Sequence, residues 1–156
     1  MKLLVDTNVV IDYIDERQGF IESARKLMLL GLLREFDLWM SPSQVTDMFY
    51  ILTNGGRASL AEEVKMSIRE TRKFINICSL SEADIDAALD STWSDFEDAC
   101  VYQCARKIKA DAIITRNQKD FEKSSIKVFD CDEWFAYLEQ TRGLVYEEIP
   151  LPPARS

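Results

Sequence analysis

The chain has 156 residues and a formal net charge of −8, which fits one ordinary domain and argues against a nonspecific nucleic-acid coat. Its apolar fraction of 47% and charged fraction of 29% are typical of a folded soluble protein. The sequence contains no histidine, which excludes a Ser–His–Asp triad, a Cys–His pair and a His-ligated zinc site.

Strand and helix patterns alternate through the first half of the chain. The expected elements are a strand at 3–5, a helix at 9–14, a helix at about 20–33, a strand at 37–40, a helix at 41–52 and a helix at 60–73. The third helix has the clearest start, because Ser41 can cap it, Pro42 suits its first turn and Gln44 can complete a capping box. Asn54-Gly55-Gly56 is a typical helix end.

The same alternation continues in the second half. The expected elements are a strand at 74–78, a helix from Ser79 or Ser81 to Leu89, a helix capped by Ser94 with Glu97 three residues on, strands at 112–115 and 127–129, and a helix from Asp130 to Gly143. We expect residues 1–142 to form one domain. Residues 143–156 are expected to form a C-terminal tail, which has three prolines between 150 and 153.

Five short strands separated by helices predict an α/β fold with a parallel sheet of about five strands and helices on both faces. Ligands of such sheets bind beyond the carboxyl ends of the strands. Two polar clusters follow strands here: Asp6-Thr7-Asn8 after the first and Thr115-Arg116-Asn117 after the fourth. If these two strands are neighbours, Asp6 and Asn117 face the same crevice.

Further acidic residues are placed to reach that crevice. Asp95 and Asp98 are three residues apart on one helix, Asp47 lies just off an apolar stripe, and Asp120 follows Asn117 by three. Crowded carboxylates repel each other and take up protons unless a cation offsets their charge. Mg²⁺ or Mn²⁺ prefers oxygen ligands and activates water without histidine, so this pattern favours hydrolysis assisted by a metal.

Each acidic or amide residue also has an ordinary structural interpretation. Asp6 can cap the next helix, and Asp95 and Asp98 are favourable in a first turn. Asp47 can be a solvated helix charge and Asn117 a turn residue. Only the whole set, in this order, favours a functional site.

The chain has no targeting or membrane-spanning pattern. Its first acid is at residue 6, too early for a signal peptide, and the apolar run Leu27–Leu33 is far shorter than a membrane span. Cys78, Cys100, Cys104 and Cys131 form no Cys-x-x-Cys pair and are expected to be buried, reduced thiols. We therefore expect a cytoplasmic protein with no membrane partner.

Three segments together resemble the PIN domain family. They are LLVDTNVVIDY at 3–13, SPSQVTDMFYIL at 41–52 and DFEDACVYQCARKIKADAIITRNQKDF at 95–121. The last is the most specific, because it joins a helix acid, a strand and Thr-Arg-Asn-x-x-Asp-Phe in one run. The resemblance covers about residues 1–135 and implies a three-layer α/β/α sandwich with a nuclease site that depends on Mg²⁺ or Mn²⁺.

The resemblance also implies an activity and a metal site. Small bacterial members are often the VapC-like ribonuclease toxin of a toxin–antitoxin pair. By position, Asp6, Asp98 and Asp120 would hold the metal. Asp47 stands where many toxin members have Glu, and its shorter side chain implies contact through a water or a weaker site. The implied reaction is metal-assisted hydrolysis of an RNA phosphodiester that leaves a 5′ phosphate and does not use the 2′-hydroxyl as nucleophile.

The remaining polar residues are expected to support the site or bind RNA. By position, Asn8, Thr115 and Asn117 match supporting polar positions, and Arg116 is predicted to contact the substrate. The segment 106–127 holds seven basic and three acidic residues, a local charge of +4. The basic residues are Arg106, Lys107, Lys109, Arg116, Lys119, Lys123 and Lys127. They offer a path for the RNA backbone, or simply a solvated helix face and loop.

Two other functions compete with the nuclease. A haloacid-dehalogenase-like phosphatase would use Asp6 as nucleophile, but it needs Asp-x-Asp, and Asn8 cannot act as a general acid. A catalytically weak or inactive PIN-like module could instead bind RNA or a protein, which Asp47 in place of Glu would favour. The apolar segment Leu27–Leu33 and the stripe of Leu60, Val64 and Ile68 are either ordinary core or a surface for an antitoxin or a homodimer.

Overall fold

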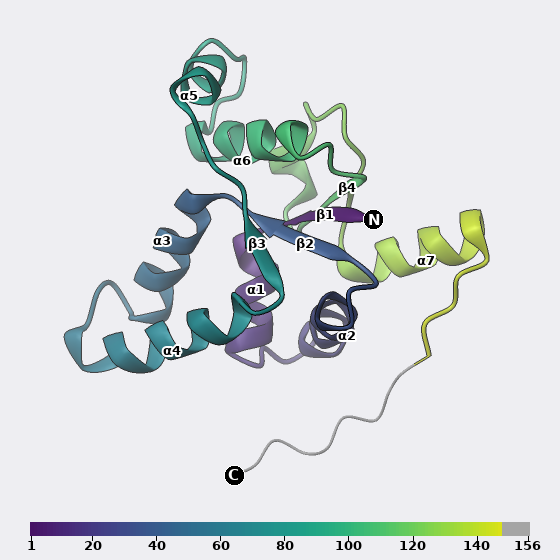
Figure 1. Cartoon of the computed structure of the whole chain (residues 1–156), viewed down its shortest axis with the longest axis horizontal. Coiled ribbons are helices and arrows are strands. Elements are labelled where there is room, and N and C mark those ends of the chain that lie inside the picture. Colours follow the sequence, from purple (N-terminus) through teal and green to yellow (C-terminus); the bar gives the residue numbers. More distant parts are fainter. Residues whose placement is uncertain (148–156) are drawn as a thin grey trace.

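Five short apolar segments pair into one parallel sheet in the order β3-β2-β1-β4-β5 (Figure 1). The strands are β1 (Lys2–Val5), β2 (Asp37–Met40), β3 (Ile75–Ile77), β4 (Ala112–Ile114) and β5 (Val128–Phe129). Leu3 pairs with Leu38 on one side and with Ala112 on the other, so β1 is the central strand. The structure is a computed structural model and describes residues 1–147.

Helices connect the strands, as the alternating pattern predicted. They are α1 (Thr7–Ile14), α2 (Ile21–Leu32), α3 (Pro42–Leu52), α4 (Ala61–Thr71), α5 (Glu82–Leu89), α6 (Phe96–Lys107) and α7 (Cys131–Arg142), with short 3-10 turns η1 (Ala58–Leu60) and η2 (Gln118–Phe121). Every strand and helix expected from the sequence is present, with bounds that differ by one or two residues. The turn η2 was not predicted as an element.

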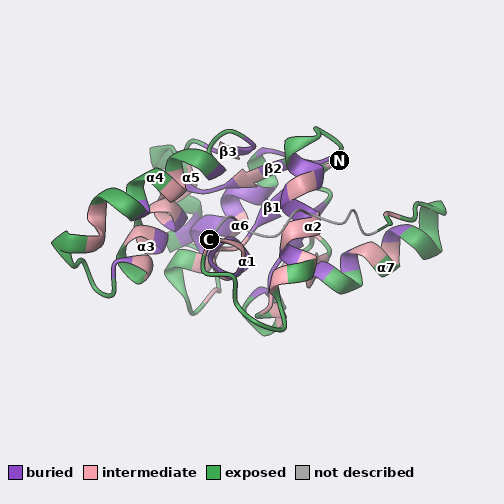
Figure 2. Cartoon of the chain, turned by 90° about the horizontal axis from the view of Figure 1, so that it is seen from below, coloured by how far each residue is buried: buried purple, intermediate pink, exposed green. Residues whose placement is uncertain are grey.

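The sheet separates two apolar cores. Side chains alternate along β1, so Leu3 and Val5 face one core and Leu4 faces the other. The first core is closed by α1, α2 and α7, and the second by α6 (Figure 1). Buried residues accordingly concentrate in the strands and on the inner helix surfaces (Figure 2). The predicted three-layer α/β/α sandwich is confirmed.

Local capping signals fix most helix ends where the sequence placed them. The Ser41 hydroxyl accepts a bond from Gln44 N at 3.3 Å, and Gln44 Oε1 accepts one from Ser41 N at 2.7 Å, which completes the predicted capping box of α3. Asp130 caps α7, and Gly143 ends it with a φ of 64°. The prediction for α6 was wrong by one residue, because Asp95 and not Ser94 is its cap.

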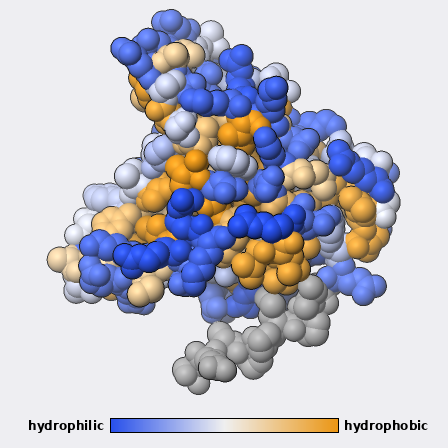
Figure 3. Space-filling view, in the orientation of Figure 1, coloured by the Kyte–Doolittle hydropathy of each residue, from blue (hydrophilic) through white to orange (hydrophobic). Residues whose placement is uncertain are grey.

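The apolar segment at the end of α2 is only partly core. Leu27 and Met28 are buried, and a Cβ on Gly31 would lie 2.4 Å from the Leu38 side chain, so a glycine lets α2 lie close to β2. Leu32 and Leu33 are 54% and 60% exposed. Figure 3 shows a hydrophobic patch in the region of α2. No helix within residues 1–147 has the length and hydropathy to span a membrane.

The cysteines and the C-terminal segment complete the fold. All four cysteines are free and buried, as predicted. After α7 the chain continues along the α2–β2 corner, where Tyr146 packs its ring 5.6 Å from Phe36 and donates to Glu35 Oε1 at 2.8 Å. The proline-containing part of the predicted tail, 148–156, lies outside the described residues.

Candidate active site

The candidate site is built on Asp6, at the carboxyl end of the central strand. The Asp6 amide donates to Ile114 O at 2.9 Å, which extends the pairing of β1 with β4 by one residue. Its side chain then turns back and Oδ1 accepts a bond from Thr7 N at 2.7 Å, so Asp6 also caps α1. The capping role expected of an isolated strand-end aspartate is therefore real, and it fixes the carboxylate in place.

A hydrogen-bond network joins the two polar clusters that follow β1 and β4. Asp6 Oδ2 accepts bonds from Thr115 Oγ1 at 2.7 Å and from Asn8 Nδ2 at 2.8 Å. Asn8 Oδ1 accepts from Arg116 N at 3.2 Å, and Thr115 Oγ1 accepts from Asn117 N at 3.0 Å. The expectation that these clusters meet at one edge of the sheet is borne out by these contacts.

A third anchor at this edge comes from Gln44. Its Oε1 completes the α3 capping box, and its Nε2 donates to Val5 O at 2.9 Å, the carbonyl just before Asp6. This bond ties the start of α3 to the end of β1. Asp47 lies three residues further on, on the same face of α3 as Gln44. The sequence predicted only the capping bond of Gln44, because nothing local reveals a bond to a distant strand.

Four carboxylates act on one another electrostatically at this edge. Burial raises the pKa of Asp98 to about 7, and the negative charges of Asp95, Asp6 and Asp120 add to the rise. Burial likewise raises the pKa of Asp6, while its bonds from Thr115 and Thr7 oppose the shift and the charge of Asp120 adds to it. The structure thus brings the three predicted metal ligands, Asp6, Asp98 and Asp120, into one negative environment.

Glu97 is an acid of this region that the sequence did not single out. A hydrogen bond with Asp47 raises the pKa of Glu97 to about 8, with burial and the nearby charges of Asp47, Asp98 and Asp95 adding to the rise. Asp47 is therefore engaged with a second carboxyl group on α6. The sequence assigned Glu97 only to a capping box with Ser94, and the approach of α3 to α6 has no local signature.

The donor set suits a hard divalent cation. Its groups are carboxylate oxygens, which Mg²⁺ and Mn²⁺ prefer, and their mutual repulsion is the cost that a cation would remove. As the side chains stand, no three His, Cys, Asp or Glu residues within residues 1–147 converge closely enough to hold an ion. The donors thus fit Mg²⁺ or Mn²⁺ by their chemistry, whereas the side chains of residues 1–147 do not form a ready-made metal site.

The Arg116 side chain pairs with a carboxylate outside the predicted metal site, that of Asp12 on α1. Its Nε lies 2.7 Å from Oδ2 of the buried Asp12, and its guanidinium carbon lies 4.4 Å from the centre of the Phe20 ring. The guanidinium is therefore held between α1 and the segment that follows it. Contact of Arg116 with a substrate stays a prediction.

Several of the other basic residues in 106–127 are likewise engaged within the fold. Lys107 pairs with Asp84 at 2.6 Å, Lys123 donates to Thr92 O, and Lys127 lies 4.4 Å from the centre of the Tyr137 ring. Arg106, Lys109 and Lys119 form no ion pair within the part of the chain that the structure describes. Arg106 in addition donates to Gln103 Oε1 at 3.5 Å, which leaves Lys109 and Lys119 without a side-chain bond or ring contact among the described residues. A basic path for RNA stays a prediction.

The chain is similar in sequence to a known protein family and to a named ribonuclease. A family model described as PIN domain matches residues 2–119. Ribonuclease VapC1 of Aquifex aeolicus is 26% identical over 138 residues, which are 85% of this chain and 92% of that protein. The match therefore extends over nearly the whole of both chains.

Solved structures share the fold at low identity. VapBC2 from Rickettsia felis, bound to a DNA fragment from its promoter, aligns with a TM-score of 0.62 and 13% identity over 83% of this chain and 98% of that one. VapBC-1 from nontypeable Haemophilus influenzae aligns with a TM-score of 0.61 and 18% identity over 85% and 99%. A toxin–antitoxin complex from Klebsiella pneumoniae aligns with a TM-score of 0.57 and 21% identity over 83% of this chain and 97% of that one.

Proposed function

The chain belongs to the PIN domain family, and from this we propose that it is a metal-dependent endoribonuclease and the toxin of a toxin–antitoxin pair. The observation that carries the proposal is the fixed Asp6 carboxylate, joined to Asn8 and Thr115 and surrounded by the charges of Asp98 and Asp120. The relative named Ribonuclease VapC1 and the similar structures that contain toxin–antitoxin complexes support it.

We assign metal binding to Asp6, Asp98 and Asp120. When bound there, Mg²⁺ or Mn²⁺ supplies positive charge to a phosphodiester and activates water for hydrolysis. Asp6 is the best-positioned ligand, because its bonds from Thr7, Asn8 and Thr115 favour the ionised form and hold it in one orientation. Asp98 projects from the first turn of α6, whose backbone is fixed by the Asp95 cap.

The polar residues divide into supporting and exposed groups. Thr115 is fully buried and its hydroxyl bonds Asp6, so it orients the carboxylate. Asn8 is half-buried and donates to the same oxygen. Asn117 is exposed beside them and is the member of this group placed to meet an RNA phosphate. Asp47, engaged by Glu97, is assigned a supporting role.

The proposed activity predicts cleavage of RNA by the purified protein with Mn²⁺ or Mg²⁺. A mixture of structured and unstructured RNAs is expected to give discrete products with 5′ phosphates, identified by mass spectrometry. A chelator is expected to abolish cleavage, and a single 2′-deoxy substitution at the cut position is expected to leave cleavage intact, since the 2′-hydroxyl is not the nucleophile. Cleavage that persists in chelator would contradict the metal requirement, and RNA binding without cleavage of any substrate would favour a binding module.

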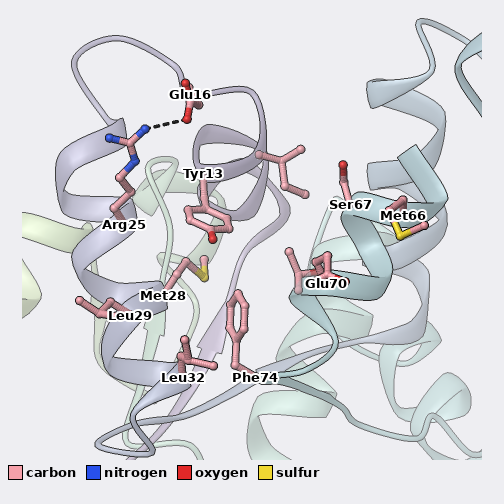
Figure 4. A pocket seen from close by; sticks show the side chains of 12 residues that line it. Tyr13, Glu16, Arg25, Met28, Leu29, Leu32, Met66, Ser67, Glu70 and Phe74 are labelled. Atoms are coloured by element: carbon pink, nitrogen blue, oxygen red, sulfur yellow. Dashed lines mark hydrogen bonds and ion pairs between the residues drawn. The ribbon is translucent and has the colours of Figure 1, made fainter. Parts of the chain in front are cut away.

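The proposed partner has a candidate surface on the opposite side from α6. A cavity of about 560 Å³ lies between α1, α2 and α4, with Met28, Leu32, Met66 and Phe74 among its lining residues (Figure 4). Leu32 and Met66 are both 54% exposed. Because the similar structures include toxin–antitoxin complexes, we propose that an apolar segment of a small antitoxin occupies this cavity.

Leu32→Glu is expected to prevent stable association with such a partner without reducing RNA cleavage, because it places a charge in the apolar cavity. The measurement is co-purification with the product of an adjacent reading frame after co-expression. Leu89→Glu is the matched control, since Leu89 is 64% exposed on α5, on the other side of the sheet. Unchanged co-purification of Leu32→Glu would exclude this cavity. A dimer of the chain alone that Leu32→Glu dissociates would show that a second copy is the occupant.

A further inference from the structure

We propose that Asp12 and Arg116 form a positioning pair that holds the segment 115–117 against α1 and thereby keeps Thr115 and Asn8 bonded to the Asp6 carboxylate. The inference rests on the proposed function, because Asp6 is the central residue of the proposed metal site. It assigns Arg116 a role other than the RNA contact expected from the sequence, and it gives Asp12 a role that no motif indicated.

Arg116 contacts α1 at both of its ends. Its backbone amide donates to Asn8 Oδ1 at 3.2 Å, and its side chain reaches Asp12 Oδ2 at 2.7 Å. Asn8 and Asp12 are four residues apart on α1 and so lie on one face, one turn from each other. One residue of the 115–117 segment is therefore fixed to two consecutive turns of the helix that Asp6 caps.

The contacts of Arg116 lead directly to the site. Its neighbour Thr115 donates to Asp6 Oδ2 at 2.7 Å, and Asn8, which accepts the Arg116 amide, donates to the same oxygen at 2.8 Å. Displacement of Arg116 would disturb both donors to Asp6. The Phe20 ring, 4.4 Å from the guanidinium carbon, packs on the cation and limits its movement.

The buried Asp12 carboxylate needs a positively charged partner. Asp12 is the one charged residue within residues 1–147 that is buried, with a side chain only 2% exposed. A buried carboxylate is costly unless it is paired. Its Oδ1 has no hydrogen-bond partner, and the second nearby cation, Arg17, is at 3.9 Å. Arg116, whose side chain is 28% exposed, is therefore the principal partner of the buried Asp12 carboxylate, and their 2.7 Å contact holds the guanidinium against α1.

Arg17 provides a matched control for a purely structural role. It contacts the same carboxylate from the loop after α1, but it has no bond to Asn8, Thr115 or Asp6. Loss of Arg17 removes a charge beside Asp12 without touching the 115–117 segment. The variants Asp12→Asn, Arg116→Ala and Arg17→Ala therefore separate positioning from charge compensation, and Arg116→Lys restores the charge without the planar guanidinium.

The first measurement is amide hydrogen exchange, which requires neither metal nor substrate. In Asp12→Asn the amides of Arg116 and Asn117 are expected to exchange about tenfold faster, because their acceptors Asn8 and Thr115 are no longer held. The Asp6 amide, bonded to Ile114 O, is the internal reference and is expected to change little. Unchanged exchange at 116 and 117, or equal acceleration in Arg17→Ala, would overturn the proposal.

The second measurement is Mn²⁺ affinity of the folded variants, by calorimetry well below their melting temperatures. Asp12→Asn and Arg116→Ala are expected to bind Mn²⁺ about 10- to 100-fold more weakly and to lose kcat more than KM, as for other residues that orient a metal ligand. Arg17→Ala is expected to stay within about twofold of the wild type. Wild-type affinity and kcat in both pair variants would show a merely structural pair. A wild-type protein that neither binds Mn²⁺ nor cleaves RNA would instead contradict the proposed function, and the exchange experiment would still decide the positioning role.

Discussion

Replacement of Asp6 by Asn is expected to lower kcat/KM for RNA cleavage by about 10³-fold or more while leaving the chain folded. A metal ion at a phosphodiester is worth several kcal/mol of transition-state stabilisation, and about 1.4 kcal/mol corresponds to each tenfold of rate. Asn retains an oxygen that can accept the bond from Thr7 N, so the cap of α1 persists. The amide lacks the negative charge needed to bind the cation.

The matched control for this variant is Asp37→Asn. Asp37 is an exposed aspartate at the start of β2, at the opposite end of the parallel strands from Asp6. Its replacement is expected to leave kcat/KM within about twofold of the wild type, since it is remote from the proposed metal site. Circular dichroism of both variants checks that they are folded. If Asp6→Asn retained more than a tenth of wild-type activity, Asp6 would not be the principal metal ligand.

The strand-end cluster could be predicted because each of its two halves is a short continuous segment of the sequence. Asp6-Thr7-Asn8 and Thr115-Arg116-Asn117 each follow directly from an apolar strand, and only one long-range fact, the pairing of β1 with β4, is needed to bring them together. Parallel sheets align the carboxyl ends of their strands, so that one fact places both clusters at one edge. The bond of Thr115 to Asp6 then follows from their position.

Contacts between helices were not predictable in the same way. The approach of Asp47 to Glu97 depends on how α3 and α6 lie at the sheet edge. The ion pair of Arg116 with Asp12 depends on the rotamer of a long side chain. Neither leaves a periodic pattern in the sequence. In both cases the charged residue has an ordinary surface interpretation until its partner is known.

The identity of the residue that caps α6 affects the candidate site. Ser94 and Asp95 are both good capping residues, and sequence alone does not decide between them. In the structure, Asp95 Oδ1 accepts bonds from Glu97 N at 2.9 Å and Asp98 N at 3.1 Å. The cap is therefore itself a carboxylate next to Asp98, and its charge adds to the rise in the Asp98 pKa. A Ser cap would have contributed no such charge.

Replacement of Asp98 by Asn is expected to act in opposite directions on activity and on stability. Loss of a metal ligand is expected to lower kcat/KM by about 10²-fold or more. In the absence of metal, however, the variant is expected to melt at a higher temperature than the wild type above pH 7. Asn resembles the neutral acid, so it avoids the cost of burying a charge and also the repulsion from Asp95, Asp6 and Asp120. Such a trade is typical of sites that concentrate like charge for function.

The sign of the pH dependence follows from the raised pKa. Asp98 has a pKa of about 7 in the folded protein against an ordinary value of 3.8, so between these values the folded state holds a proton that the unfolded chain has released. The free energy of unfolding of the wild type therefore falls as pH rises from about 4 to 7. Asp98→Asn lacks this contribution. Glu97, whose pKa of about 8 is raised in part by the charge of Asp98, also contributes to the fall, and its contribution is expected to be smaller in Asp98→Asn. The difference between the two proteins therefore reports Asp98 together with its coupling to Glu97.

Melting curves with and without Mn²⁺ test both halves of this prediction. Above pH 7, millimolar Mn²⁺ is expected to raise the melting temperature of the wild type by a few degrees, because a ligand that binds only the folded state stabilises it. The same addition is expected to have little effect on Asp98→Asn. A wild-type melting temperature that is flat between pH 5 and 8 would contradict the repulsion among these carboxylates, and equal stabilisation of both proteins by Mn²⁺ would place the ion elsewhere. Asp98 is thus expected to destabilise the fold without metal, and binding of Mn²⁺ to the same carboxylate is expected to recover that stability.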